Sequence, residues 1–189
     1  MRAIWGLVFA MNLLAPRGGA AELHVAAAGT AFRTLSSAVK AASPGDTVLV
    51  HDGTYGHENS VTGGDQADSA NSPVVLRRSG TSSAWITIKA EHKWAAILDC
   101  EMQCDSYIDL LNASYIVIQD FVIRRGYKEG IHSNDTAHHI VLRGNRIEDI
   151  ANRISSSPYG LDGLYTNPNC HHFVIDGNVF HFGLGFTWH

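Results

Sequence analysis

Two pairs of adjacent histidines stand out as residues that could bind a metal ion. His138-His139 and His171-His172 each open an apolar stretch that predicts a β-strand. Imidazole nitrogen is a common ligand of zinc and other transition metals. Adjacent residues of a regular strand point to opposite faces, however, so neighbouring rings do not converge on one ion. We therefore expect these histidines to fill the surface at the edges of stacked strands, without forming a zinc site.

The cysteines are the other residues with distinct chemistry. Cys100 and Cys104 flank a three-residue stretch and could close a small disulfide loop. Cys170 could be a buried small hydrophobe or half of a different pairing. The chain has no Cys-x-x-Cys motif that would indicate zinc binding or redox work. Three thiols are too few for a disulfide scaffold, so packing must supply most of the stability.

The histidine pairs belong to an internal repeat in the second half of the chain. Three segments align without gaps, and each predicts a strand, a tight corner and a second short strand. The segments are 114–125 (SYIVIQDFVIRR), 138–149 (HHIVLRGNRIED) and 171–182 (HHFVIDGNVFHF). A further short apolar strand precedes each one. The second and third segments are further apart than the first and second, which an insertion at one corner explains. Three strands per repeat predict an all-β protein built as a parallel β-helix.

The aligned positions predict how the coils stack. Alternation within the strands directs one pair of apolar residues from each coil into the solenoid, at equivalent stacked positions: Ile116 and Ile118, Ile140 and Leu142, and Phe173 and Ile175. Asp120, Gly144 and Gly177 align at the corner, where a residue must tolerate a positive φ angle. Asn145 and Asn178 follow this corner, and we expect their amides to hydrogen-bond along the solenoid.

The first half of the chain follows the same pattern less closely. Strands are predicted at 46–50, 74–76, 85–88 and 96–98, and a polar loop at 57–72. Residues 34–42 (TLSSAVKAA) have helical spacing of apolar side chains and predict a helix that covers the open end of the first coil. At the other end, residues 186–189 (FTWH) follow a coil directly and expose apolar side chains. Either a partner covers this end or the solenoid is truncated at its C-terminus, and we favour truncation because terminal repeats normally carry polar caps.

The N-terminus and the charge balance bear on where the protein works. Residues 1–21 combine a basic start, an apolar stretch and small residues, which is the layout of a secretory signal peptide. We thus expect a β-helix domain over 22–189, secreted to the periplasm or the extracellular space. The net charge of −4 gives no sign of nucleic-acid binding. We expect a monomer that has no membrane contact after signal cleavage.

Several phrases of the sequence carry a resemblance to a known group. Residues 30–35 (TAFRTL), 41–48 (AASPGDTV) and 52–55 (DGTY) resemble the opening of secreted right-handed parallel β-helix proteins. These include pectate lyases of polysaccharide lyase family 9 and the related alginate and chondroitin lyases. Gly130-Ile131-His132 and Gly144-Asn145 are similar to the generic repeat of those proteins. The resemblance implies β-elimination on a uronic-acid polysaccharide, with a basic side chain as proton acceptor and Ca²⁺ as a possible cofactor.

The resemblance also implies that the site lies on the long face formed by the first strand of each coil. The residues expected there fall into three roles. The catalytic candidates are Lys128 as the base and Arg125 as a ligand of the uronate carboxylate; the substrate-binding candidates are His132, Asn134 and Tyr165; and the candidate Ca²⁺ ligands are Asp109, Asp135 and Asp162. A solvated loop lysine and a plain surface arginine are the alternative interpretations of the first two.

Three functions remain open at this point. The first is a polysaccharide lyase with an acidic polysaccharide as its substrate. The second is a β-helix that binds carbohydrate or presents a surface without catalysis. The third is a glycoside hydrolase on the same fold, for which Asp109 with Asp135 or Asp162 would supply the two carboxyl groups.

Overall fold

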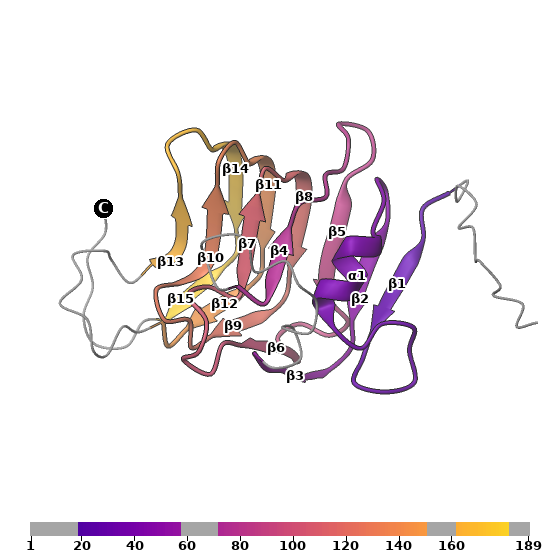
Figure 1. The fold of residues 1–189 in the computed structure, drawn as a ribbon, viewed down its shortest axis with the longest axis horizontal. Helices are drawn as coiled ribbons and strands as arrows, with labels where there is room; N and C mark the ends of the chain where they lie inside the picture. The colour runs from indigo at the N-terminus through magenta and orange to yellow at the C-terminus, as the bar shows by residue number, and fades with distance from the viewer. Residues whose placement is uncertain (1–18, 58–71, 151–161, 182–189) are drawn as a thin grey trace, which may run out of the picture.

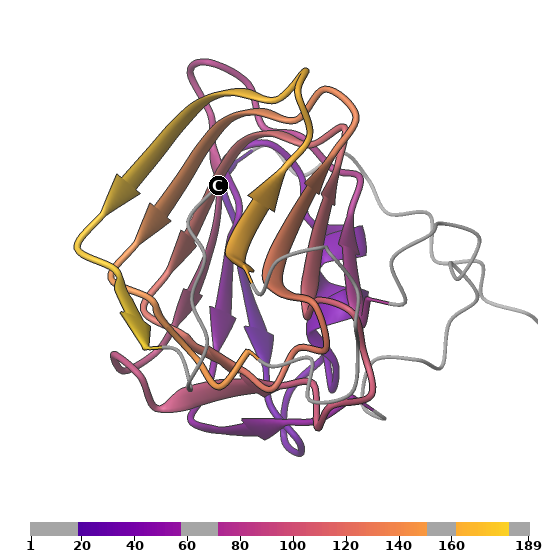
Figure 2. The same ribbon diagram turned by 90° about the vertical axis from the view of Figure 1, so that its left-hand side faces the viewer.

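Coils of short parallel strands stack along one axis in the computed structural model, which describes residues 19–57, 72–150 and 162–181 (Figure 1). The strands of successive coils form three parallel sheets around a central core, as the view along the stack in Figure 2 shows. The chain is a right-handed parallel β-helix, as the repeat and the resemblance predicted.

Each sheet takes one strand from nearly every coil. Sheet I contains β4 (Val74–Leu76), β7 (Ile108–Leu111), β10 (Glu129–Asn134) and β13 (Asp162–Thr166). Sheet II contains β1 (Glu22–Val25), β2 (Thr47–Val50), β5 (Ile86–Ala90), β8 (Ser114–Gln119), β11 (His138–Arg143) and β14 (His171–Asp176). Sheet III contains β3 (Gly53–Tyr55), β6 (Ala96–Asp99), β9 (Val122–Arg124), β12 (Arg146–Glu148) and β15 (Val179–His181).

The predicted register of the repeats is confirmed. Ile116 lies opposite Ile140, which lies opposite Phe173 in the next coil. Ile116 and Ile140 are fully buried, and Phe173 packs against the same core. Ile175 keeps its predicted register, but it is 46% exposed because β14 is the last strand of sheet II in the described residues.

The corner between sheets II and III also forms as predicted. Asp120, Gly144 and Gly177 have φ angles of 65°, 63° and 62°, in the left-handed region. At Gly144 a Cβ atom would lie 2.5 Å from the Asp120 carboxylate, so a side chain there would require the Asp120 side chain to move. The amide of Asn145 donates to Asn178 Oδ1 at 3.1 Å, which confirms the expected ladder along the solenoid.

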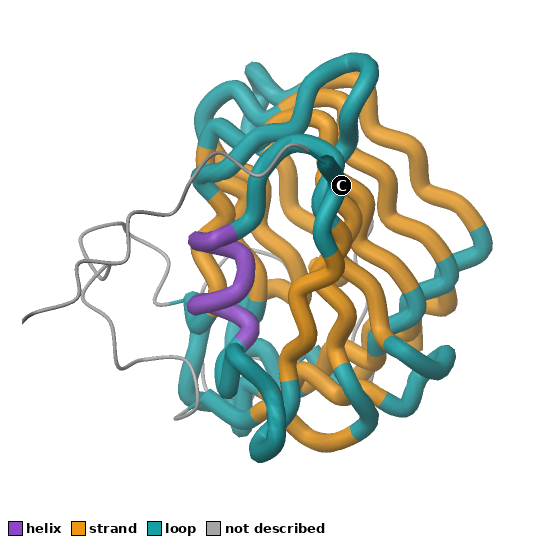
Figure 3. Tube along the Cα trace, turned by 90° about the vertical axis from the view of Figure 1, so that its right-hand side faces the viewer, coloured by secondary structure: helices purple, strands orange, loops and turns teal. Residues whose placement is uncertain are grey.

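The predicted helix is α1 (Leu35–Ala41), and its boundaries follow from local hydrogen bonding. The hydroxyl of Thr34 accepts from the backbone N–H of Ser37 at 3.2 Å, which caps the N-terminus of the helix. Its apolar side chains are buried as expected. The helix packs against β1, β2 and β4 at the N-terminal end of the stack (Figure 3), where β1 extends sheet II by one strand.

The structure resolves the cysteine pairing that the sequence left open. Cys100 and Cys104 form a disulfide after β6, with Cα atoms 5.3 Å apart, and both residues are buried. Cys170 is a free, half-buried thiol that accepts a hydrogen bond from the Ser133 hydroxyl at 3.2 Å.

Some of the predictions fall on other parts of the chain. The first 18 residues of the predicted signal peptide (1–21), most of the predicted loop at 57–72 and the C-terminal residues from 182 lie outside the described residues. Within the described ranges, no helix has the length and apolar character needed to cross a lipid bilayer.

Asn145 provides a direct test of the stacked corner. Its Oδ1 accepts from the Phe121 N–H, and its Nδ2 donates to the Ile118 carbonyl and to Asn178. Because Asn145 is fully buried, Asn145→Ala leaves the Phe121 N–H without a partner. We expect a loss of about 3 kcal/mol in the free energy of unfolding, measured by urea denaturation.

Asn178→Ala is the comparison variant: its Oδ1 accepts from the Asn145 N–H at 2.9 Å, but Asn178 lies in the last described coil and is only half-buried. We expect it to cost about 1 kcal/mol. Equal losses for the two variants, or no loss for Asn145→Ala, would contradict this role of the buried amide.

Candidate functional site

The outward side of sheet I gathers polar and aromatic side chains from three coils. The register aligns Asp109 on β7 with His132 on β10 and Tyr165 on β13. Alternation turns Ile131 and Ser133 into the core, so that His132 and Asn134 face outward. We call the group formed by Asp109, His132, Asn134, Tyr165 and Asn167 the sheet I face.

His132 lies at the centre of this face. Its side chain is 16% exposed, and its ring contacts that of Tyr165 with centroids 5.4 Å apart. Burial lowers the pKa of His132, and the positive charge of Lys128 lowers it further. The imidazole is therefore neutral near pH 7 and can accept a proton.

The amide of Asn134 is fixed between two neighbours. Asn167 Nδ2 donates to Asn134 Oδ1 at 2.5 Å, and Asn134 Nδ2 lies 3.5 Å from His132 Nδ1. The accepted hydrogen bond orients the amide so that its NH₂ group is directed toward His132. The sequence interpretation missed Asn167, although Asn167 follows Asn134 by 33 residues, the same separation as between the second and third repeats.

Asp109 is a fully buried carboxyl group beside His132, at the paired position of the neighbouring strand β7. Its Oδ1 lies 3.7 Å from His132 Nδ1, and neither of its oxygens has a partner in hydrogen-bonding geometry among the described residues. Burial raises the pKa of Asp109 to about 6, although the nearby Asn134 amide and the Arg77 charge favour the ionised form. Such a carboxylate can stabilise a proton on the adjacent imidazole.

A second acidic group lies at the start of the same strands. Glu129 on β10 is opposite Asp162 on β13. Burial raises the pKa of Glu129 to about 7; Lys128 opposes this shift, and the acidic neighbours Asp105, Asp162 and Asp109 add to it. Glu129 is thus partly protonated near neutral pH and can exchange a proton with a bound molecule.

The two predicted catalytic cations each hold an ion pair. Lys128 Nζ lies 2.7 Å from Asp105 Oδ2, and this hydrogen bond raises the pKa of Lys128. Arg125 binds the buried Asp99 through two hydrogen bonds of 2.6 Å. Arg124 donates to the same carboxylate at 2.8 Å. Arg125 therefore anchors the turn after β9, and the structure does not bring its guanidinium to His132.

The predicted calcium ligands are not brought together. Asp162 is level with Glu129, whereas Asp135 follows six residues later, a separation of about 20 Å along the strand direction. Asp135 accepts instead from Asn112 Nδ2 at 3.0 Å. In the described ranges, the groups whose ligand atoms all lie within 4.8 Å do not include this trio. The three residues thus do not fit a shared Ca²⁺ ion.

Comparisons with known proteins agree with this architecture. No protein-family model and no curated protein sequence matches the chain. Among solved structures, pectate lyase Pel9A superposes with a TM-score of 0.59 at 15% identity, over 83% of this chain and 38% of that chain. The chain thus spans well under half of that lyase. At this identity the likeness confirms the fold, including the predicted resemblance to β-helix lyases.

Two further solved structures are similar with lower TM-scores. An alginate lyase from Paenibacillus sp. str. FPU-7 has a TM-score of 0.46 at 15% identity, over 85% of this chain and 66% of that chain. A mannuronic acid specific polysaccharide family 6 lyase from human gut microbiota has a TM-score of 0.44 at 15% identity, over 68% of this chain and 27% of that chain.

The buried charge of Asp109 predicts a pH-dependent stability change. A raised folded-state pKa means that ionisation opposes folding, so stability falls as the pH rises from the unfolded value near 4 to about 6. Asp109→Asn removes this cost. Urea denaturation should show the variant more stable than wild type by about 2 kcal/mol above pH 7, with the difference gone below about pH 4.

Asp176→Asn is the control, because Asp176 is exposed on β14 of sheet II, pairs with the exposed Arg143 and does not affect the pKa of Asp109. We expect it to change stability by less than about 0.5 kcal/mol at any pH. A stability difference between Asp109→Asn and wild type that does not vary with pH would show that the carboxyl group is not titrating as described.

Proposed function

We propose that the sheet I face binds an acidic polysaccharide and cleaves it by β-elimination at a uronic-acid residue. The observation that carries this proposal is the grouping of a neutral His132, an oriented Asn134 amide and Tyr165 next to the buried Asp109. These groups supply a proton acceptor, a hydrogen-bond donor and a phenol within one surface. Elimination next to a carboxylate is accelerated by a base, by a donor to the charge that develops on the carboxylate, and by a proton source for the leaving oxygen.

The form of the face suits a polymer. Its strands run side by side about 4.8 Å apart, and so present an extended surface across several coils. Tyr165 is 38% exposed, which leaves its ring available to pack on a sugar. An extended polar surface with one exposed aromatic ring fits a saccharide chain better than a small enclosed ligand.

In the proposed reaction, His132 accepts the proton from the carbon next to the uronate carboxylate. The released electron pair forms a carbon–carbon double bond, and the glycosidic bond to the neighbouring sugar breaks. The leaving oxygen takes a proton from the Tyr165 hydroxyl. Asp109, 3.7 Å from His132 Nδ1, stabilises the imidazolium that forms. The NH₂ group of Asn134 hydrogen-bonds the carboxylate as negative charge accumulates on it.

We assign the predicted cation Lys128 a binding role. A general base must be unprotonated near neutral pH. The hydrogen bond to Asp105 raises the pKa of Lys128 and so keeps it protonated. The ammonium group is close enough for its charge to lower the pKa of His132. A uronate carboxylate could exchange for Asp105 as its partner. The substrate would then be held by Lys128 and deprotonated by His132.

Export fits the same proposal. Residues 1–21 have the layout of a secretory leader. The protein would then meet its substrate in the periplasm or outside the cell.

Hydrolysis is the second candidate, and Glu129 favours it. A carboxyl group with a pKa of about 7 can protonate a glycosidic oxygen as a general acid. Such a reaction would release new reducing ends without an unsaturated sugar. The product therefore distinguishes hydrolysis from elimination.

His132→Ala tests the proposed base. Wild-type protein is mixed with pectate, alginate and chondroitin, with Ca²⁺ supplied, and the ultraviolet absorbance of the unsaturated uronide is followed. On the substrate that reacts, we expect His132→Ala to lower kcat by about 100-fold or more. His181→Ala on β15 is the matched control and should retain wild-type activity.

The outcomes are distinct. No unsaturated product on any of these polymers, or full activity of His132→Ala, would refute the elimination mechanism. Binding of a polymer without turnover would instead support the non-catalytic interpretation of the sequence.

Lys128→Ala separates binding from proton abstraction. If the ammonium group holds the uronate carboxylate, the variant should raise KM about tenfold and change kcat much less. A loss of kcat as large as that of His132→Ala would make Lys128 the base, as the sequence resemblance implied.

A further inference from the structure

Four histidines form a two-by-two array on sheet II, away from the sheet I face. His138 and His139 open β11, and His171 and His172 open β14. The rings stack between coils: the centroids of His138 and His171 are 5.0 Å apart, and those of His139 and His172 are 4.6 Å apart. Neither pair takes part in the proposed elimination.

A backbone feature brings the rings of each pair to the same side. His139 and His172 have φ angles of 53° and 57°, in the left-handed region. The strand alternation therefore breaks at the second histidine, and both side chains of a pair approach one another. The expectation that alternation keeps adjacent histidines apart is thus wrong here, because it assumed extended backbone throughout.

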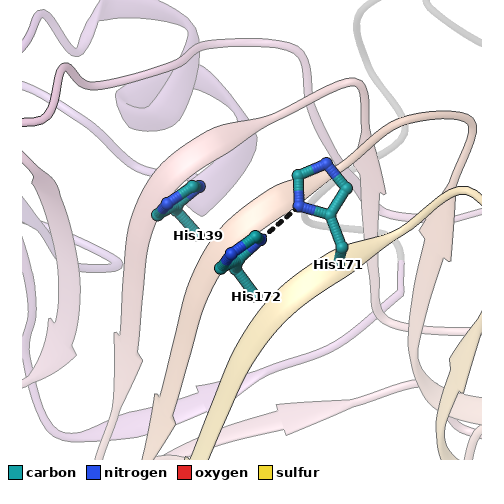
Figure 4. Close-up of side chains that lie close together, drawn as sticks. All are labelled: His139, His171 and His172. Atoms are coloured by element: carbon teal, nitrogen blue, oxygen red, sulfur yellow. Dashed lines mark hydrogen bonds between the residues drawn. The ribbon is translucent and has the colours of Figure 1, made fainter.

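The nitrogens are close enough to act together. His171 Nδ1 and His172 Nδ1 lie 2.5 Å apart, and His138 Nδ1 and His139 Nδ1 lie 2.8 Å apart. One ligand nitrogen from each of His139, His171 and His172 lies within 4.8 Å of the others (Figure 4). The planes of His171 and His172 meet at 77°, so their facing nitrogens can chelate one ion.

The chemistry of these nitrogens favours a cation of the zinc type. Neutral imidazoles bind Zn²⁺, Cu²⁺ and Ni²⁺ well and bind Ca²⁺ poorly. Tetrahedral zinc with bonds near 2.0–2.1 Å places its nitrogens about 3.3 Å apart. The His171–His172 pair needs only a small opening to reach this spacing.

We propose that His139, His171 and His172 bind a divalent transition-metal ion of the zinc type and thereby join the last two described coils. The ring of His139 lies parallel to that of His172, at 4°, and must tilt to direct a nitrogen at the ion. His139 is half-buried and His171 and His172 are exposed, which gives the rings freedom to adjust. Water completes the coordination.

Isothermal titration of metal-stripped protein with Zn²⁺ near neutral pH tests this site. We expect one ion to bind per chain and the thermal midpoint of unfolding to rise. His172→Asn is the informative variant, because asparagine tolerates a left-handed φ and so preserves the backbone. Loss of a residue that only supports a metal ligand typically lowers metal affinity 10–100-fold. Loss of the ligand itself in His172→Asn should therefore lower the affinity for zinc at least about tenfold.

The matched control uses the other group of possible ligands in the described residues, formed by Asp52, Glu91 and His92. His92→Ala should leave zinc affinity unchanged, and Ca²⁺ in place of Zn²⁺ should give no comparable binding. No zinc binding, unchanged affinity of His172→Asn, or loss of binding in His92→Ala would each overturn the proposal.

Discussion

Parallel pairing of successive coils in strict register is the constraint on which both surfaces depend. Each strand hydrogen-bonds to the equivalent strand one coil away, so residues at the same repeat position form a column along the solenoid. Ile116 and Ile140 fill such a column inside the core. The same register builds the column of Asp109, His132 and Tyr165 outside it. A slip by one residue would exchange these inner and outer columns.

The corner residues keep that register fixed. Left-handed backbone at Asp120, Gly144 and Gly177 turns the chain at the same point in each coil, and Asn145 ties neighbouring corners together. Such turns cost little because glycine, asparagine and aspartate tolerate positive φ. The solenoid thus holds outward side chains on a rigid scaffold, which is what an extended binding face requires.

Much of the fold could be predicted from the sequence because it depends on spacing. The aligned corners and the apolar columns follow from residue types at fixed intervals, and the helix follows from Leu35, Ala38 and Val39 on one face. The outer column of the sheet I face could also be predicted, since His132 and Tyr165 occupy the same repeat position.

The remaining features depend on contacts that spacing does not specify. Arg125 is held by Asp99, 26 residues earlier, and nothing in the local sequence indicates this ion pair. The burial of Asp109 results from tertiary packing around an outward position. Convergence of the histidines required left-handed backbone at His139 and His172, which the alternating pattern of a strand does not indicate. Local backbone geometry and long-range pairing thus decide the chemistry of both sites.

The central claim is that the outer column of sheet I is where an acidic saccharide chain binds. The most direct measurement is an NMR titration of isotopically labelled protein with short oligouronides, with side-chain signals of both surfaces followed in one experiment. We expect the signals of His132, Asn134 and Tyr165 to shift together and to saturate, while those of His171 and His172 stay unchanged. Saturable shifts confined to sheets II or III, with the His132 signal unmoved, would contradict it.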